Sequence, residues 1–214
     1  EFQANYESGS WTVVGGLFYM QEQVGSHQEA YADDLLTGPG GFTFLRTIDD
    51  ALENTSWAAY ANVSYALTER LNLGAGVRYT DETKDYERST STFSNFPGLT
   101  QDPAFAFTAK ETWTDTSPMV SMDFQANENV MLYGRVAQGF KSGGFNGRAN
   151  NPGEQVPYDP EEVISYEIGL KSDWPENAVR ANLAFFYNDY TDFQARVSGT
   201  TTDPGTGLPS PELT

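Results

Sequence analysis

Apolar and polar side chains alternate at every second position along much of this chain, which is the period of β-strands rather than of helices. In residues 162–174, Ile164, Tyr166, Ile168 and Leu170 share one face, and Ser165, Glu167, Gly169 and Lys171 share the other. No stretch keeps a 3.6-residue apolar period bounded by helix caps. The pattern therefore predicts a chain built from strands.

The same alternation predicts eight strands, near residues 1–8, 11–23, 55–68, 71–85, 113–126, 129–141, 162–174 and 178–194. A strand of ~13 residues, at roughly 3.3 Å per residue and tilted by about 40°, is long enough to cross an apolar band of about 25 Å. Pro118 lies inside the fifth segment. Because proline cannot donate a ladder hydrogen bond, we expect it to mark a strand end or a bulge.

The connections between these segments alternate between short and long. Short ones lie around residues 8–10, 68–70, 127–128 and 175–177, and long ones cover roughly 24–54, 86–112, 142–161 and the residues after 194. One rim of an outer-membrane barrel carries tight turns and the other carries long loops, whereas a Greek-key sandwich has no reason to keep such an order. The expected fold is an all-β, antiparallel up-and-down transmembrane β-barrel segment.

Composition narrows the possible functions. The 214 residues include 30 acidic and 12 basic ones, a net charge of −18, which argues against a nucleic-acid partner. There is no cysteine, and the single histidine, His27, cannot form a multi-histidine zinc site, so we expect a plain surface residue there. The mean hydropathy of −0.51 suits a soluble protein but does not exclude a membrane barrel, whose strands are only half apolar. No spacing of a nucleophile and a base stands out, so we expect no enzyme, no metal and no cofactor.

If the apolar face of the sheet meets lipid, the opposite face is a polar wall around the lumen. We expect six charged residues on that wall: Arg78, Asp123, Arg135, Glu167, Lys171 and Arg180. Antiparallel pairing across the turn at 175–177 places Asp173 near Arg180 and Lys171 near Asn182.

Tryptophans flank the predicted strands. Trp11 and Trp174 lie beside short turns, and Trp57 and Trp113 lie at the long-loop ends of their strands. Aromatic rings favour the two lipid–water interfaces, so we expect the four tryptophans to form two girdles.

Two runs carry a family resemblance. Residues 117–148 contain GFKSGGFN at 139–146, and residues 158–196 contain YEIGLK at 166–171 and YNDYTDF at 187–193. This order of strands, turns and motifs resembles the β-barrel of TonB-dependent outer-membrane receptors. The resemblance implies a 22-stranded barrel with an N-terminal plug, in the outer membrane of a Gram-negative bacterium.

The resemblance also implies energised uptake of scarce nutrients, most often ferric siderophores. The implied partners are outer-membrane lipid, the N-terminal plug, TonB and a ferric siderophore or similar small ligand. Residues 1–214 are expected to be part of such a barrel, because they hold about eight strands and no plug, TonB box or terminal aromatic strand.

Ligand contacts are expected in the long loops at 24–54 and 86–112. Cationic side chains there suit an anionic chelate, and aromatic ones suit a catechol or a sugar. The candidates are Tyr31, Arg46, Tyr86, Arg88, Phe93 and Phe96.

Two alternatives remain from the sequence. A soluble secreted carbohydrate-binding β-sandwich would pack its apolar faces on each other and use its aromatic residues to bind sugars. A complete small structural barrel of the outer membrane is also compatible with eight strands.

Overall fold

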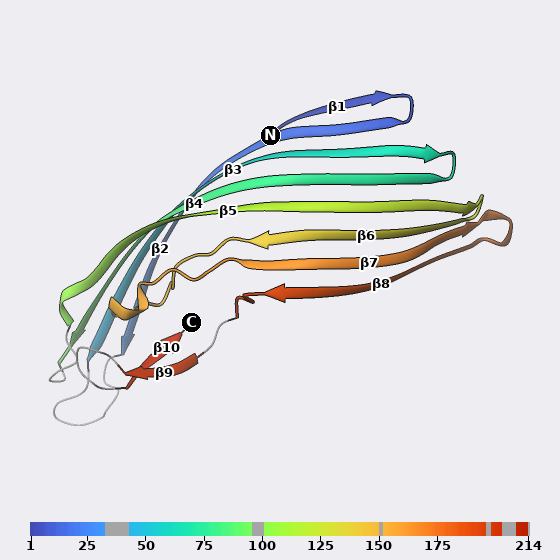
Figure 1. Ribbon diagram of the computed structural model, residues 1–214. Coiled ribbons are helices and arrows are strands. Elements are labelled where there is room, and N and C mark those ends of the chain that lie inside the picture. Colours follow the sequence, from blue (N-terminus) through green and yellow to red (C-terminus); the bar gives the residue numbers. More distant parts are fainter. Residues whose placement is uncertain (33–42, 96–100, 150–151, 196–197, 203–208, 214) are drawn as a thin grey trace.

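The computed structural model describes the chain except for residues 33–42, 96–100, 150–151, 196–197, 203–208 and 214. Its main feature is one eight-stranded antiparallel sheet with the strands side by side in chain order (Figure 1). The strands are β1 (Phe2–Ser8), β2 (Trp11–Ala32), β3 (Phe44–Thr68), β4 (Leu71–Ser94), β5 (Gln101–Asn127), β6 (Val130–Lys141), β7 (Glu161–Trp174) and β8 (Val179–Thr191). The predicted all-β, up-and-down arrangement is confirmed.

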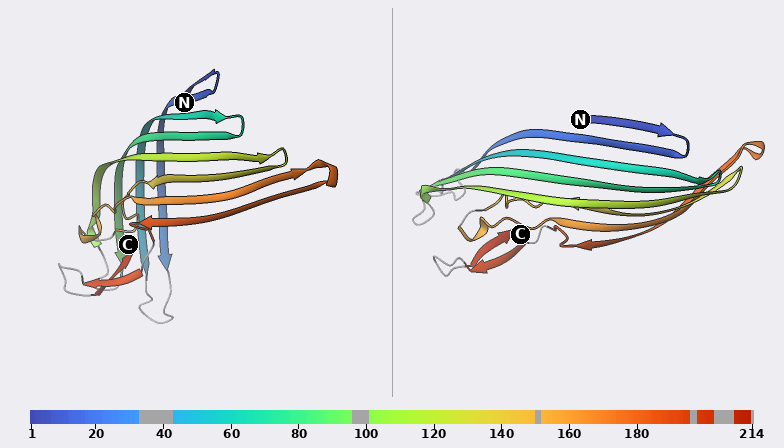
Figure 2. Two further views of the ribbon diagram at one scale, coloured as in Figure 1. Left: turned by 45° about the vertical axis from the view of Figure 1, so that its right-hand side comes forward. Right: turned by 45° about the horizontal axis from the view of Figure 1, so that its top comes forward.

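Smaller elements complete the described chain. β9 (Ser198–Thr202) and β10 (Pro209–Leu213) form a separate antiparallel hairpin that the sequence pattern did not predict. Two short 3-10 turns are present, η1 (Pro152–Glu154) and η2 (Pro175–Asn177). Within the described ranges, no helix has the length and apolar character needed to cross a membrane. The large sheet curves into an open arc with β1 and β8 at its two edges (Figures 1 and 2).

The strands β2 to β5 are much longer than the sequence predicted. They contain 22, 25, 24 and 27 residues, whereas β6, β7 and β8 contain 12, 14 and 13. The prediction that 24–54 and 86–112 are long loops is therefore wrong, because most of these residues continue the sheet. We call this part of β2–β5 the extension (residues 20–32, 44–56, 82–94 and 101–113) and the rest of the sheet the wall; the two meet at a bend (Figure 2).

The register gives the wall one apolar face. A single cross-strand row passes through Trp11, Tyr65, Leu73, Met122, Gly134, Ile168 and Phe185. Ile168 is 64% exposed and Phe185 is 63% exposed, so nothing in the described chain covers this face. Because large apolar side chains are rarely left in water as a continuous surface, this face requires an apolar environment outside the chain.

Aromatic pairs lie near both ends of the apolar face. The ring centroids of Trp11 and Tyr65 are 4.4 Å apart, and those of Trp57 and Tyr79 are 5.3 Å apart. Trp113 does not belong with them, because it lies on the opposite face and is only 8% exposed. The predicted place of Trp113 in a girdle is therefore wrong.

Pro118 lies within β5 instead of at its end. It is opposite Val77 of β4, and β5 continues beyond it to Gln101. The ladder between β5 and β6 starts one residue later, at Met119 opposite Ala137. Pro118 therefore marks the end of the pairing with β6, where a missing N–H leaves no ladder partner unsatisfied.

Candidate ligand-binding site

The six residues predicted for the polar wall lie on one face of the sheet, opposite the apolar row. The register places Arg135 opposite Glu167, and Asp123 opposite Tyr133. The pairing of Arg78 with Ser117 places Arg78 on this face. The pairing of β7 with β8 places Lys171 and Arg180 there as well. We call this side of the sheet the inner face.

The predicted neighbours across the short β7–β8 turn are confirmed. Lys171 is opposite Asn182, and Asp173 is opposite Arg180. Arg180 Nε donates to Asp173 Oδ2 over 3.0 Å, and both side chains are exposed. An exposed ion pair of this kind contributes little to stability. Its presence agrees with the predicted register of β7 and β8.

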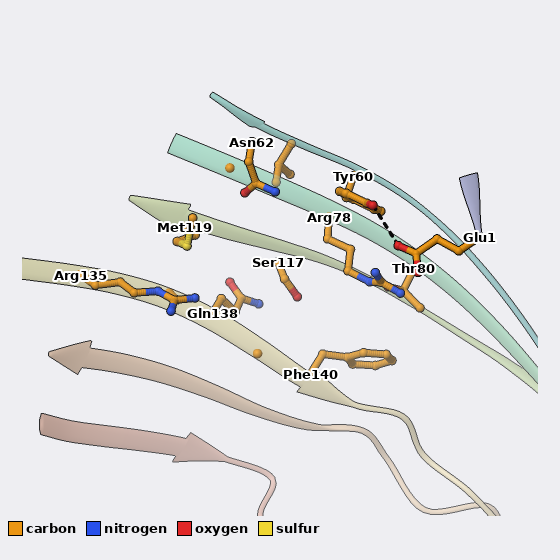
Figure 3. A pocket seen from close by; sticks show the side chains of 14 residues that line it. Glu1, Tyr60, Asn62, Arg78, Thr80, Ser117, Met119, Arg135, Gln138 and Phe140 are labelled. Atoms are coloured by element: carbon orange, nitrogen blue, oxygen red, sulfur yellow. Dashed lines mark hydrogen bonds between the residues drawn. The ribbon is translucent and has the colours of Figure 1, made fainter. Parts of the chain in front are cut away.

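A hollow of about 460 Å³ lies on the inner face between β3 and β6 (Figure 3). Its polar lining includes Tyr60, Arg78, Ser117 and Arg135. The Tyr60 hydroxyl donates to Glu1 Oε1 over 2.9 Å, and Arg78 Nε donates to Thr80 Oγ1 over 3.2 Å. The hollow is open on the side away from the sheet, and its polar groups can contact a partner on that side.

Residues 142–149, which follow β6 and which we call the strap, fold back onto the inner face of the extension. At its start, Lys84 donates to Ser142 Oγ and to the Gly143 carbonyl, both over 2.7 Å. Ser142 Oγ in turn donates to Glu82 Oε1 over 2.7 Å. The strap then runs along β4, since its later residues contact Tyr86 and Arg88. It adds a second layer to the extension that the wall lacks.

A buried ionic cluster holds the far end of the strap. Arg88, 2% exposed, donates through Nε to the Ala149 carbonyl over 2.8 Å and through Nη1 to the Gly147 carbonyl over 2.9 Å. Nη1 also donates to Asp50 Oδ1 over 2.6 Å, and the Tyr86 hydroxyl donates to the same oxygen over 2.6 Å. Burial and the hydrogen bond to the Asp50 carboxylate raise the pKa of Tyr86 to about 12.

Aromatic packing fills the space between the strap and the sheet. Phe145 stacks on Tyr86 with an interplanar angle of 6° and a centroid distance of 5.7 Å, and its centroid lies 5.9 Å from that of Trp113. Phe107 packs edge-on against Tyr86. At Gly143, a Cβ would overlap the Tyr158 carbonyl and the Trp113 ring, so the strap approaches the sheet more closely than a side chain allows.

The predicted ligand residues fall into two groups. Tyr31, at the end of β2, is 79% exposed, and Phe93, near the end of β4, is 57% exposed. Tyr86 and Arg88 belong to β4 and are buried under the strap, so their predicted position in an open loop is wrong.

Arg46 belongs to β3 and is half-buried, so it too is not a loop residue. Burial and, to a smaller extent, the charge of Arg88 lower the pKa of Arg46. Phe96 lies outside the described residues.

The sequence analysis missed the apolar residues of β5 that form the core of the extension under the strap. Phe105, Phe107 and Ala109 alternate with Ala106, Thr108 and Lys110, which is a strand pattern inside a segment predicted to be a loop. That alternation was the available signal. Among the described residues, no three His, Asp or Glu side chains are grouped so that they could hold a metal ion.

Comparison with known proteins agrees with this fold. The sequence matches the family described as "TonB dependent receptor-like, beta-barrel" over residues 1–212. It is 26% identical over 137 residues to the pesticin receptor of Yersinia pestis, an alignment covering 64% of this chain and 19% of that receptor. The chain therefore spans about a fifth of the length of this curated relative.

Two solved structures share the arrangement of strands. The ferric yersiniabactin uptake receptor FyuA from Yersinia pestis gives a TM-score of 0.57 at 23% identity, over 89% of this chain and 31% of that one. The ferric-catecholate import receptor Fiu from E. coli K12 gives a TM-score of 0.56 at 13% identity, over 94% of this chain and 34% of that one. The chain belongs to the TonB-dependent receptor-like β-barrel family, whose barrels lie in the outer membrane of Gram-negative bacteria.

Proposed function

We propose that this chain is part of the wall of an outer-membrane receptor that takes up ferric siderophores, with energy delivered through TonB. The observation that carries the proposal is the family match across residues 1–212, which covers the whole eight-stranded sheet. Relatives named for ferric yersiniabactin and ferric catecholate support iron complexes as the substrate class.

The two faces of the wall suit two different partners. The apolar row from Trp11 to Phe185 suits outer-membrane lipid, because its side chains are large, apolar and uncovered. The inner face, with Arg78, Arg135 and Glu167, suits a polar partner, which in this family is the N-terminal plug. Contact with TonB belongs to the full-length receptor, of which residues 1–214 are a part.

The two alternative functions fit the sheet less well. A soluble sandwich needs a second sheet against the apolar face, yet in the described residues that face is exposed and the other sheet is the small hairpin β9–β10. A complete eight-stranded barrel needs β1 to pair with β8, and these two are the edges of the sheet.

Uptake by the full-length receptor tests the proposal. The gene that contains this chain is deleted and restored in its host, and uptake of radioiron is measured for ferric yersiniabactin, a ferric catecholate and a ferric hydroxamate. We expect deletion to abolish uptake of at least one complex, and a protonophore to do the same in the restored strain. Unchanged uptake of every complex after deletion would overturn the proposal.

A further inference from the structure

In the strap, the buried Arg88 holds the backbone on both sides of Arg148. Arg88 binds the carbonyls of Gly147 and Ala149, which are the residues on either side of Arg148. The Ala149 N–H donates to the Asn146 carbonyl over 3.1 Å, and the Arg148 N–H donates to Asn146 Oδ1 over 3.0 Å. Arg148 therefore lies at the tip of a tight turn whose backbone is held on both sides.

The side chain of Arg148 is left available by this arrangement. It is exposed, and it forms no ion pair with any residue in the described part of the chain. Arg88, by contrast, is buried and already bound to Asp50, so it cannot reach a ligand while the strap is in place.

Carboxylates lie on both faces of the extension and are most numerous on its outer face. The register places these carboxylates on its outer face: Glu29, Asp49, Glu53, Asp85 and Glu87. The inner face of the extension carries acids as well, and there Lys84 lies 3.2 Å from Glu82 and Arg88 lies 2.6 Å from Asp50. Arg46 interacts with Glu154 and is close enough to Arg88 for the two cations to repel each other. Arg88 and Lys84 thus have carboxylate partners, whereas Arg148 keeps a positive charge that no ion pair within the described residues offsets, which favours an anion at the strap.

We propose that Arg148 contacts an anionic ferric chelate and that Arg88 is the positioning residue that holds it in place. This assignment rests on the proposed function, because it specifies that the ligand of the proposed receptor is negatively charged. A guanidinium on a backbone that is already ordered loses less entropy on binding than one on a free loop. Its charge-assisted hydrogen bonds to carboxylate or catecholate oxygens supply both affinity and orientation.

Binding to the purified full-length receptor tests the assignment. The probes are a ferric tris-catecholate and ferric citrate, which are anionic, and a ferric trihydroxamate, which is uncharged. We expect Arg148→Ala to weaken binding of an anionic complex about tenfold, the loss of one charge-assisted contact, and Arg148→Lys to weaken it less. Arg70→Ala is the matched control, since Arg70 is an exposed arginine in the turn at the opposite end of β4 and is expected to bind as the wild type does.

A double-variant cycle separates positioning from general stability. Arg88→Lys keeps the charge but loses the planar fork that binds two carbonyls, so we expect it to weaken binding about threefold. In the Arg148→Ala background, Arg88→Lys should cause no further loss, because the residue that it positions is gone. An additive loss would indicate a merely structural role and would overturn the positioning assignment.

The outcomes distinguish the two proposals. If the wild type binds an anionic complex and Arg148→Ala binds it equally well, the assignment fails while the proposed function survives. The assignment also fails, and the proposed function survives, if the wild type binds only the uncharged complex. If the wild-type receptor neither binds nor transports any ferric complex, the proposed function fails and the assignment fails with it.

Discussion

The two halves of β4 belong to one strand and keep one alternation, but their inner side chains lie in different surroundings. In the wall half, Arg78 lines an open hollow and the outward Val77 is 46% exposed. In the extension half, Tyr86 is 6% exposed and Arg88 is 2% exposed, because the strap covers them. Among the described residues, the cluster of buried apolar side chains therefore lies on the extension side of the bend.

This difference shows where the stability of each half originates. Above the bend, contacts within the chain order the strap and the sheet together, so substitutions there should act locally. In the wall, few side chains of the described residues are buried on either face, so order depends more on the lipid outside and on the partner inside. Substitutions in the extension should therefore alter contacts within the chain, whereas substitutions in the wall should alter contacts with lipid or with the partner on the inner face.

Removing the Arg88 side chain should have the largest effect. Arg88→Ala leaves Asp50 and two strap carbonyls without their buried cation, a change that typically costs about 3–5 kcal/mol. We expect hydrogen exchange of the strap and of residues 82–94 to accelerate in the full-length receptor, while exchange in the wall is unchanged. Exchange mass spectrometry resolves the two regions.

An exposed ion pair on the same strands provides the control. Lys110 Nζ lies 3.2 Å from Asp85 Oδ2, and both side chains are more than half exposed. Lys110→Ala should change exchange little, since such pairs contribute about 0–1 kcal/mol. If Arg88→Ala behaves like Lys110→Ala, the strap is not held by the buried cluster.

A charge on the outward face of the wall should have the next largest effect. Ile168, at the middle of β7, is 64% exposed on the apolar face. Ile168→Arg should destabilise the receptor by about 2–4 kcal/mol, the cost of a cation facing lipid near the bilayer midplane. The measurements are the heat-resistant folded fraction on gels and the melting temperature in detergent.

The matched substitution faces the other way on the same strand. Ser165→Arg places the same side chain on the inner face, where water or a polar partner can solvate it, and we expect a much smaller loss. Equal losses for both variants would contradict the assignment of the apolar face to lipid.

The sequence predicted the wall better than the extension, and the reason is physical. In the wall, one face is apolar and the other polar, so alternation identifies residues such as Ile164–Leu170 directly. In the extension, segments such as 24–32 carry polar side chains on both faces. Pairing with neighbouring strands sets the structure of such segments, and no alternation within them indicates it, whereas the alternation at 105–110 is a local signal that the prediction overlooked.

The burial of Arg88 could not be predicted from the sequence. Its cover comes from Gly147 and Ala149, about sixty residues further along the chain, and no pattern near Arg88 indicates that contact. Arg88 was predicted to be a loop residue because 86–112 was assigned as a long connection, and its charge made it a candidate ligand contact. By contrast, Asp173 and Arg180 were paired correctly, because a short turn fixes the register across it.

Glycine packing inside the wall provides a smaller test. A Cβ on Gly169 would overlap the ring of Tyr133, whose hydroxyl donates to Glu167 Oε1 over 2.5 Å. Gly169→Ala should therefore displace the ring and lower stability by about 1 kcal/mol, the low end of overpacking costs. On the opposite face, a Cβ on Gly134 meets its nearest atoms at 3.9 Å, so Gly134→Ala should leave the melting temperature unchanged or slightly raised. Equal shifts for the two variants would contradict a close Tyr133–Gly169 contact.

His27, on the exposed outer face of the extension, should give the smallest effect. Its Nδ1–H donates to Asp49 Oδ1 over 2.6 Å, and this hydrogen bond, with a weaker one to Glu29, raises the pKa of His27 above 6.5. A raised pKa means that the folded state favours the charged ring, so the stabilisation is complete below pH 6.5 and is lost as pH rises through the folded-state pKa. Exchange of residues 24–31 and 45–53 should therefore be faster at pH 8 than at pH 5.5 by a factor of about two at most, after correction for intrinsic rates, since solvent screens exposed pairs. His27→Gln should remove this pH dependence and leave the exchange rates of the wall and the strap as they are in the wild type. If the variant keeps the pH dependence, other groups cause it.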